Sequence, residues 1–294
     1  MSSGLDAGVD AFADEVGSEG PVTIGGLGTR GGSVAGVRTV AAPPGIDWIE
    51  PAEMTMRCGA GTPVAEVEAA LAEHGQCVAV PAGGTIGGAL AVGHSGLRRL
   101  GWGPVRDTLL QVRYVSARGD VVKGGGPTVK NVSGFDMCRL LVGSRGTLGF
   151  LADVILRTRP QPVDERWFTS TGDPWELLAG LFRPTSVLWD GTTTWVLLDG
   201  HPDDISTQAA QFSLAATDGP PELPVHRWSL PPSALADLSR DDGPFVAEIG
   251  VGVVHHHRPA DARNPDPVVV DLSRRLKEAF DPGGRLNPGI GPAP

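Results

Sequence analysis

The sequence predicts an α+β protein of two domains, and three observations support this. Segments typical of short strands and short helices alternate along the chain, with glycines that cluster rather than repeat at a fixed period. At 294 residues the chain is long enough for two domains, since domains usually contain about 100–200 residues. The order and spacing of the predicted strands and helices change after Pro160. We therefore expect a first domain at residues 1–160 and a second at residues 161–294.

Composition restricts the class of protein. A net charge of −10 argues against nonspecific binding of nucleic acid. The three cysteines, Cys58, Cys77 and Cys138, lie far apart, which excludes a cysteine-ligated iron–sulfur cluster within the chain and indicates no disulfide framework. No apolar stretch approaches the ~20 residues of a membrane span, and the first residues lack a signal-peptide pattern. We therefore expect a cytoplasmic protein without a membrane span.

The first domain opens with a helix, a strand and a glycine loop. Apolar spacing predicts the helix over residues 5–16, and a strand follows at 21–24. Residues 25–32, GGLGTRGG, contain a G-x-G-x-x-G pattern of the Rossmann type. That motif needs a helix that begins within it, whereas residues 33–44 lack helical periodicity and end in two prolines. The pattern favours a loop between strands that binds phosphate through backbone N–H groups, and a Rossmann site is the weaker alternative.

A second glycine-rich stretch runs from Pro81 to Gly149. Each glycine inside a regular element costs about 0.5–1 kcal/mol, so this density indicates backbone that must approach a flat or phosphorylated ligand closely. The regular elements predicted around it are strands at 54–58, 77–81 and 150–159, helices at 62–75 and 135–142, and a hairpin at 109–123.

The second domain has a different order of elements. Its strands and helices follow the sequence β-α-β-β-α-β, which is the ferredoxin-like pattern. The predicted strands are 166–169, 186–189, 193–198 and 245–254, and the predicted helices are 173–182 and 204–216. A last helix at 268–280 leads into Asp281-Pro282-Gly283-Gly284 and Leu286-Asn287-Pro288-Gly289.

Several short motifs together resemble the FAD-binding proteins of the vanillyl-alcohol-oxidase or p-cresol-methylhydroxylase type, and among them the FAD-binding subunits of bacterial glycolate oxidase. The resemblance covers residues 20–160 and about the last fifteen residues. The motifs are Gly25 to Thr29, Thr85-Ile86-Gly87-Gly88, Ser95-Gly96-Leu97-Arg98-Arg99, Val105-Arg106-Asp107, Lys130-Asn131-Val132-Ser133-Gly134-Phe135-Asp136, Gly146-Thr147-Leu148-Gly149, and Phe280-Asp281-Pro282 to Leu286-Asn287-Pro288-Gly289.

This resemblance implies a two-subdomain FAD-binding fold, followed by a small ferredoxin-like α+β cap whose C-terminal segment returns to the FAD domain. It also implies which residues hold the cofactor. The pyrophosphate would be bound by Gly25, Gly26, Leu27, Gly28 and Thr29, the ribityl chain and ring by Pro81, Gly83, Gly84, Thr85, Ile86, Gly87, Gly88, Gly93, Ser95 and Gly96, and the adenine side by Gly146, Thr147 and Gly149. Asn287 either hydrogen-bonds the flavin or caps the last helix. The first loop contains no histidine, so we expect noncovalent FAD.

A flavin that oxidises a 2-hydroxy acid needs a base for the hydroxyl proton and a cation for the carboxylate. His255 and His257 flank the end of a predicted strand and could share a face, which makes one of them a candidate base; the alternative is a solvated strand end. Two histidines without a third ligand predict no metal site. The candidate cations are Lys130, Arg139, Arg98 and Arg99, each of which has surface solvation as its alternative; Lys130 is favoured because its motif matches the family.

The sequence therefore predicts an FAD-dependent oxidoreductase that oxidises a small 2-hydroxy acid, such as glycolate or lactate, by hydride transfer to flavin N5. Because no second redox motif is present, electrons would pass on to a partner subunit or another acceptor. The alternative is a noncatalytic FAD-binding or electron-relay subunit of an oxidase complex.

Overall fold

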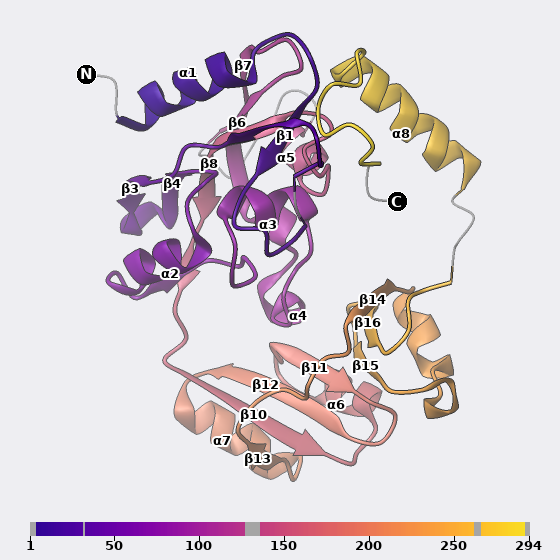
Figure 1. Cartoon of the computed structure of the whole chain (residues 1–294). Coiled ribbons are helices and arrows are strands. Elements are labelled where there is room, and N and C mark those ends of the chain that lie inside the picture. Colours follow the sequence, from indigo (N-terminus) through magenta and orange to yellow (C-terminus); the bar gives the residue numbers. More distant parts are fainter. Residues whose placement is uncertain (1–3, 32, 127–135, 262–265, 292–294) are drawn as a thin grey trace. The chain divides into compact units, whose positions relative to one another are not determined.

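The computed structural model describes residues 4–31, 33–126, 136–261 and 266–291, and the chain divides into two units (Figure 1). The first unit comprises residues 1–96, 104–161 and 264–294, and the second comprises 97–103 and 162–263. The chain leaves the first unit after residue 161. The sequence did not predict that residues 97–103 group with the second unit, where Gly101 N donates a hydrogen bond to Thr185 O.

The first unit is built on a five-stranded sheet in which all neighbouring strands are antiparallel. Its central strand is buried along seven of its eight residues, because both faces of the sheet are covered. In spatial order the strands are β3 (Ile46–Glu50), β4 (Thr55–Gly59), β8 (Phe150–Arg157), β6 (Leu109–Val115) and β7 (Val121–Gly125).

Two apolar cores lie against this sheet, and side chains of β8 enter both. Leu151, Val154 and Leu156 pack in the larger core with helices α2, α3 and α5, while Phe150 and Ala152 pack in the smaller one with α1 and the parallel pair β1–β2. These elements are α1 (Gly4–Val16), β1 (Val22–Gly25), β2 (Arg38–Ala41), α2 (Val64–Ala72), α3 (Ile86–Val92) and α5 (Met137–Leu141). Among the described residues no helix follows the first glycine loop before β2, so the Rossmann alternative is wrong.

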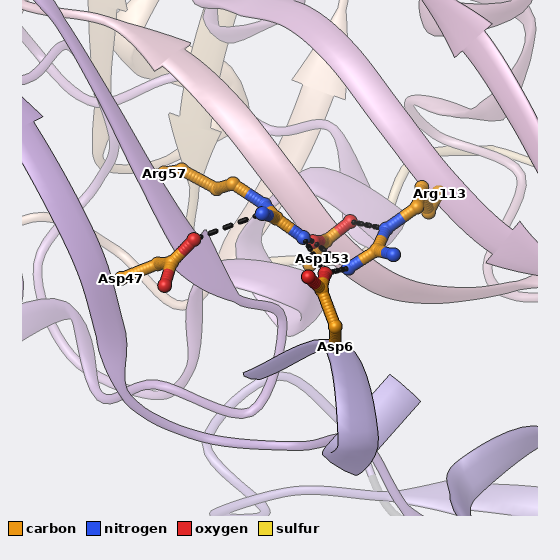
Figure 2. A network of polar contacts seen from close by, with 5 residues as sticks. All are labelled: Asp6, Asp47, Arg57, Arg113 and Asp153. Carbon is orange, nitrogen blue, oxygen red and sulfur yellow. Dashed lines mark hydrogen bonds and ion pairs between the residues drawn. The ribbon is translucent and has the colours of Figure 1, made fainter. Parts of the chain in front are cut away.

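An ion-pair network attaches α1 to the sheet (Figure 2). Asp153 of β8 is buried, and its Oδ2 lies 2.5 Å from Arg57 Nη2 and 2.6 Å from Arg113 Nη2. Asp6 of α1 binds the same two guanidinium groups at 2.6 and 2.7 Å, and Asp47 binds Arg57 at 2.8 Å. The hydrogen bond from Arg57 is the largest cause that lowers the pKa of Asp6 to about 2.

The strands predicted at 77–81 and 150–159 differ from those observed. Only β5 (Gln76–Cys77) forms at the first place, pairing with the short β9 (Arg159–Pro160). Pro81 lacks an N–H for a ladder, and the chain continues from β5 into the glycine loop. The shortest helices of the two units are the 3-10 helices η1 (Pro51–Glu53), η2 (Val105–Asp107), η3 (Pro232–Asp237) and η4 (Arg240–Asp242) and the α-helix α4 (Arg99–Trp102).

The second unit contains a seven-stranded antiparallel sheet. Its first elements follow the ferredoxin-like order β10-α6-β11-β12-α7-β13, as the sequence predicted. In spatial order the strands are β13 (Ala215–Thr217), β10 (Asp164–Ser170), β12 (Thr194–Gly200), β11 (Ser186–Trp189), β15 (Phe245–Glu248), β16 (Val253–His256) and β14 (His226–Ser229). The two helices are α6 (Pro174–Gly180) and α7 (Pro202–Gln211).

One strand of this pattern was assigned to the wrong segment. The fourth ferredoxin-like strand is β13, which pairs with β10, and not the segment 245–254. Helix α7 ends at Gln211, so residues 215–217 are free to form this strand. That segment is a hairpin of two strands, β15 and β16, added at the other side of β11. Gly250 and Gly252 have φ angles of 79° and 84°, so a single strand cannot continue through them.

The C-terminal segment completes the first unit. After α8 (Pro267–Phe280), Leu286 pairs in parallel with Val22 of β1, and the yellow end of the chain meets the indigo strand in Figure 1. Arg285 donates hydrogen bonds to five main-chain carbonyls, those of Val16, Gly17, Glu19, Gly20 and Ala117. In the described part of the chain no helix is both long and apolar enough to traverse a bilayer.

Candidate functional site

The first unit contains a cavity of about 1060 Å³ whose walls come from segments far apart in the sequence. This volume is at the upper end of the roughly 300–1,000 Å³ usual for small-molecule sites. The predicted cofactor residues that line it are Gly25, Gly26, Leu27, Gly28, Thr29, Pro81, Thr85, Gly87, Gly88, Gly146, Gly149 and Asn287. The two glycine-rich regions identified in the sequence therefore share one cavity.

Glycine is required where the two loops touch. Gly84 has a φ of +67°, and a Cβ there would collide with Thr29 Oγ1 and Arg30 Nη1. In the first loop Gly28 has a φ of +71°, which other residues rarely adopt, while a Cβ on Gly26 would make only ordinary contact, 3.4 Å from Thr85 Oγ1. Backbone rather than side chains therefore forms this part of the wall.

Arg30 fastens the first loop to the second. Its guanidinium donates hydrogen bonds to the main-chain oxygens of Pro81, Ala82 and Gly83, at 2.7, 2.8 and 2.5 Å. Partial burial lowers the pKa of Arg30. Arg30 is not among the cofactor residues that the sequence predicted, although its position within the glycine loop was a usable signal.

The charges around the cavity favour an anionic ligand. Arg30, Arg145 and His94 line it, whereas the described lining residues include no aspartate or glutamate. This is a local exception in a chain with a net charge of −10. A phosphorylated ligand fits such a wall because guanidinium groups and backbone N–H groups both bind phosphate oxygens.

Asn287 connects three parts of the wall. Its Oδ1 accepts hydrogen bonds from Thr23 Oγ1 at 2.8 Å and Ile24 N at 3.1 Å, and its Nδ2 donates to Arg145 O at 2.7 Å. The side chain does not cap α8, whose C-terminal residue is followed by Asp281 in the capping position. Asn287 therefore holds β1 against the loop at 145–146.

The other predicted cofactor residues lie outside the lining, and their contact with a cofactor stays a prediction. Ile86 and Thr147 are fully buried, and Gly93 ends α3. Ser95 Oγ accepts a hydrogen bond from Val105 N at 3.0 Å. The remaining three are Gly83, Gly84 and Gly96.

The candidate catalytic histidines have different surroundings in the second unit. His255 lies on β16, with Nε2 3.0 Å from Glu248 Oε1. His257 lies beyond the end of that strand, exposed and beside Gly243, so strand alternation does not place the two on one face. Between them His256 is buried and stacks on Trp228, and burial lowers its pKa.

The candidate cations also differ. Lys130 lies outside the described residues. Arg98 pairs with Glu165, and Arg139 pairs with Asp107 and Asp136, so these two guanidinium groups are already engaged. Within the described ranges no cluster of three or more His, Cys, Asp or Glu side chains could hold a metal ion.

Comparisons with known families agree with this geometry. Residues 39–125 match the family described as FAD binding domain, and residues 235–290 match FAD linked oxidases, C-terminal domain. The two matched segments and the α+β fold are similar to those of FAD-binding proteins of the p-cresol-methylhydroxylase type. Neither match covers half of the chain.

Named relatives match only part of their length. Glycolate oxidase subunit GlcE of Escherichia coli is 39% identical over 123 residues, which are 40% of this chain and 35% of that protein. Glycolate oxidase subunit GlcD of Bacillus subtilis is 31% identical over 145 residues, 46% of this chain and 31% of that protein. A D-lactate dehydrogenase of Archaeoglobus fulgidus is 36% identical over 110 residues, which are 36% of this chain and 25% of that protein. The matched segments thus span about a third or less of these relatives.

The fold extends over nearly the whole chain. A solved structure of alkyldihydroxyacetonephosphate synthase superposes with a TM-score of 0.67 at 15% identity, covering 95% of this chain and 73% of that one. This likeness concerns the fold alone.

Proposed function

We propose that this chain binds FAD noncovalently in the cavity of the first unit and takes part in oxidising a small 2-hydroxy acid such as glycolate or lactate. The observation that carries the proposal is the cavity itself, with two glycine loops joined by Arg30 and no acidic side chain among its described lining residues. The relatives named glycolate oxidase subunits and D-lactate dehydrogenase support the substrate class.

The residues of the cavity fit an extended dinucleotide. Gly25 to Thr29 would bind the pyrophosphate through backbone N–H groups, and Arg30 would place a positive charge beside it. The loop 81–88 would follow the remainder of the cofactor. Noncovalent attachment is favoured because the first loop contains no histidine and the described lining contains no cysteine. The lining does include His94, so the attachment has to be tested directly.

Bound FAD would supply a two-electron acceptor at flavin N5. This chain would supply the base, for which His255 is the best candidate because Glu248 holds its ring, and His257 is the further candidate. Lys130 stays the candidate cation for the substrate carboxylate. Electrons would then pass to a partner subunit or another acceptor, since the sequence contains no second redox motif.

The test is a visible absorption spectrum of the purified chain, before and after anaerobic addition of glycolate or lactate. We expect a flavin spectrum that bleaches with a hydroxy acid, and flavin released into the supernatant after acid precipitation. Protein that cannot be reconstituted with FAD would overturn the proposal, and flavin retained in the precipitate would overturn noncovalent binding.

A second function is favoured by one observation, that relatives are named as subunits. The chain would then be a noncatalytic FAD-binding or electron-relay subunit. In that case the bound flavin bleaches with hydroxy acid only after the catalytic partner is added.

A further inference from the structure

A polar face lies on the outer three strands of the second unit's sheet. Arg227 of β14 stands directly opposite His255 of β16, and His255 stands opposite Val246 of β15. Because side chains alternate along a strand, Glu248 lies on the same face as Val246. The opposite face carries Trp228, Val254 and Ala247, which pack in an apolar core. Three strands thus bring Arg227, His255 and Glu248 to one face.

His255 and Glu248 form a buried pair. Their Nε2 and Oε1 atoms are 3.0 Å apart, and the side chains are 15% and 5% exposed. In the neutral imidazole the Nε2–H group donates a hydrogen bond to the carboxylate, which leaves Nδ1 without a proton. Nδ1 is therefore the ring atom that can accept a hydrogen bond from a ligand, and Glu248 fixes the orientation of the ring.

The nearby cations have no carboxylate of their own. Arg227 is half-buried, and neither Arg227 nor Arg99 has an ion-pair partner among the described residues. Burial and the charge of Arg99 lower the pKa of Arg227, while the charge of Glu248 raises it. The surroundings of Arg227 therefore contain a second guanidinium group and one carboxylate, and that carboxylate is already hydrogen-bonded to His255. The excess positive charge suits a small anion, and guanidinium binds a carboxylate through two parallel hydrogen bonds.

We propose that Arg227, His255 and Glu248, with Arg99 beside them, form a binding site for a small carboxylate that carries an adjacent hydroxyl group. Arg227 binds the carboxylate, Nδ1 of His255 accepts a hydrogen bond from the hydroxyl, and Glu248 acts as a positioning residue. This site deepens the proposed function, on which it rests for the identity of its ligand as a 2-hydroxy acid.

The site is tested with two ligands that differ by one hydroxyl group, glycolate and acetate. The FAD-loaded full-length chain is first reduced with dithionite, so that no turnover occurs, and binding is measured by calorimetry. We expect wild-type protein to bind glycolate more tightly than acetate. Arg227→Met should weaken both ligands at least about tenfold, since it removes charge-assisted hydrogen bonds, and Arg227→Lys should weaken them less.

Glu248→Gln separates the two parts of the site. With the ring no longer held by a carboxylate, the preference for glycolate over acetate should fall while acetate affinity changes little. The matched control is Arg166→Met, because Arg166 lies on β10 of the same unit in a partly exposed pair with Asp164. Bound flavin per chain and the thermal unfolding midpoint report whether each variant is folded.

Three outcomes would overturn the inference: wild-type protein that binds neither ligand, Arg227→Met and Arg227→Lys proteins that bind both ligands as wild type does, or a glycolate preference unchanged in Glu248→Gln. These outcomes differ from failure of the proposed function. If glycolate still bleaches the flavin of Arg227→Met with an unchanged KM, the proposed carboxylate site is wrong, while the proposed function stands. A chain that cannot bind FAD, but binds glycolate through Arg227, would sink the flavoprotein proposal alone.

Discussion

The cavity of the first unit and the polar face of the second unit are built in opposite ways. The cavity wall is largely backbone, with glycines at the contacts between loops and Arg30 bridging to main-chain carbonyls. The polar face is made of side chains, contributed one by one from β14, β15 and β16. A backbone-lined site is sensitive to side chains added where its loops meet, as at Gly84, whereas a side-chain site depends on the identity of a few polar groups. Substitutions should therefore act differently in the two places.

Gly84→Ala should have the largest effect, because it adds a side chain at the point where the two glycine loops meet. Its φ of +67° disfavours alanine, and the new Cβ would collide with Thr29 and Arg30. We expect a loss of about 1–3 kcal/mol in the free energy of unfolding and at least ~10-fold weaker FAD binding. Flavin fluorescence quenching and denaturant titration measure the two quantities.

The control for this variant is Gly283→Ala in the same unit, where a Cβ meets nothing within 4 Å. Equal FAD affinity in Gly84→Ala and wild type would contradict the backbone-lined description of the site.

Arg30→Met should have a smaller effect, because methionine can adopt the same backbone conformation and only the hydrogen bonds between the two loops are removed. Three hydrogen bonds to Pro81, Ala82 and Gly83 are lost, together with one positive charge at the cavity wall. We expect the dissociation constant for FAD to rise about tenfold, measured by flavin fluorescence. Arg118→Met, at a guanidinium exposed on the hairpin between β6 and β7, is the control. Equal FAD affinity of Arg30→Met and Arg118→Met would show that the hydrogen bonds of Arg30 do not support FAD binding.

Asp6→Asn should have the smallest effect and a clear pH dependence, which a backbone-lined site lacks. The pKa of Asp6 is lowered from 3.8 to about 2 in the folded chain, chiefly by the hydrogen bond from Arg57. The unfolded chain therefore binds the proton more readily, and the stability contributed by this carboxylate is present above pH 4 and is lost as pH falls towards 2. Because Asp6 is partly exposed, the difference is modest at neutral pH.

The measurement is the free energy of unfolding of wild type and Asp6→Asn at a series of pH values. The two curves should converge at the acid end. A difference that stays constant with pH would show that the charge of Asp6 is not the cause.

The sequence revealed the glycine loops because their signal is local. Unusual glycine density marks a site wherever backbone must approach a ligand, and Gly25 and Gly88 could be assigned to one cavity without coordinates. The partners of Arg30 and Asn287 could not be predicted, because they are main-chain atoms brought close by folding. Glu248 and Arg227 were missed since their proximity to His255 depends on strand register.

The fourth strand of the second domain was predicted at the wrong place, because a longer apolar segment gave a stronger strand pattern than the short strand that forms. The segment 245–254 is apolar almost throughout and was taken as one strand, although its two glycines turn the chain back. The true fourth strand, β13, has only three residues, two exposed alanines and a threonine. Short edge strands carry too weak a pattern to be recognised from sequence alone.

Asn287 also makes the cavity depend on a residue far along the chain from its glycine loops. Its amide bridges Thr23 and Arg145, which stand 264 and 142 positions earlier. A truncation before residue 287 would keep both glycine loops and lose the bridge between β1 and the loop at 145–146. We therefore expect such a truncated protein to bind FAD more weakly than the intact one.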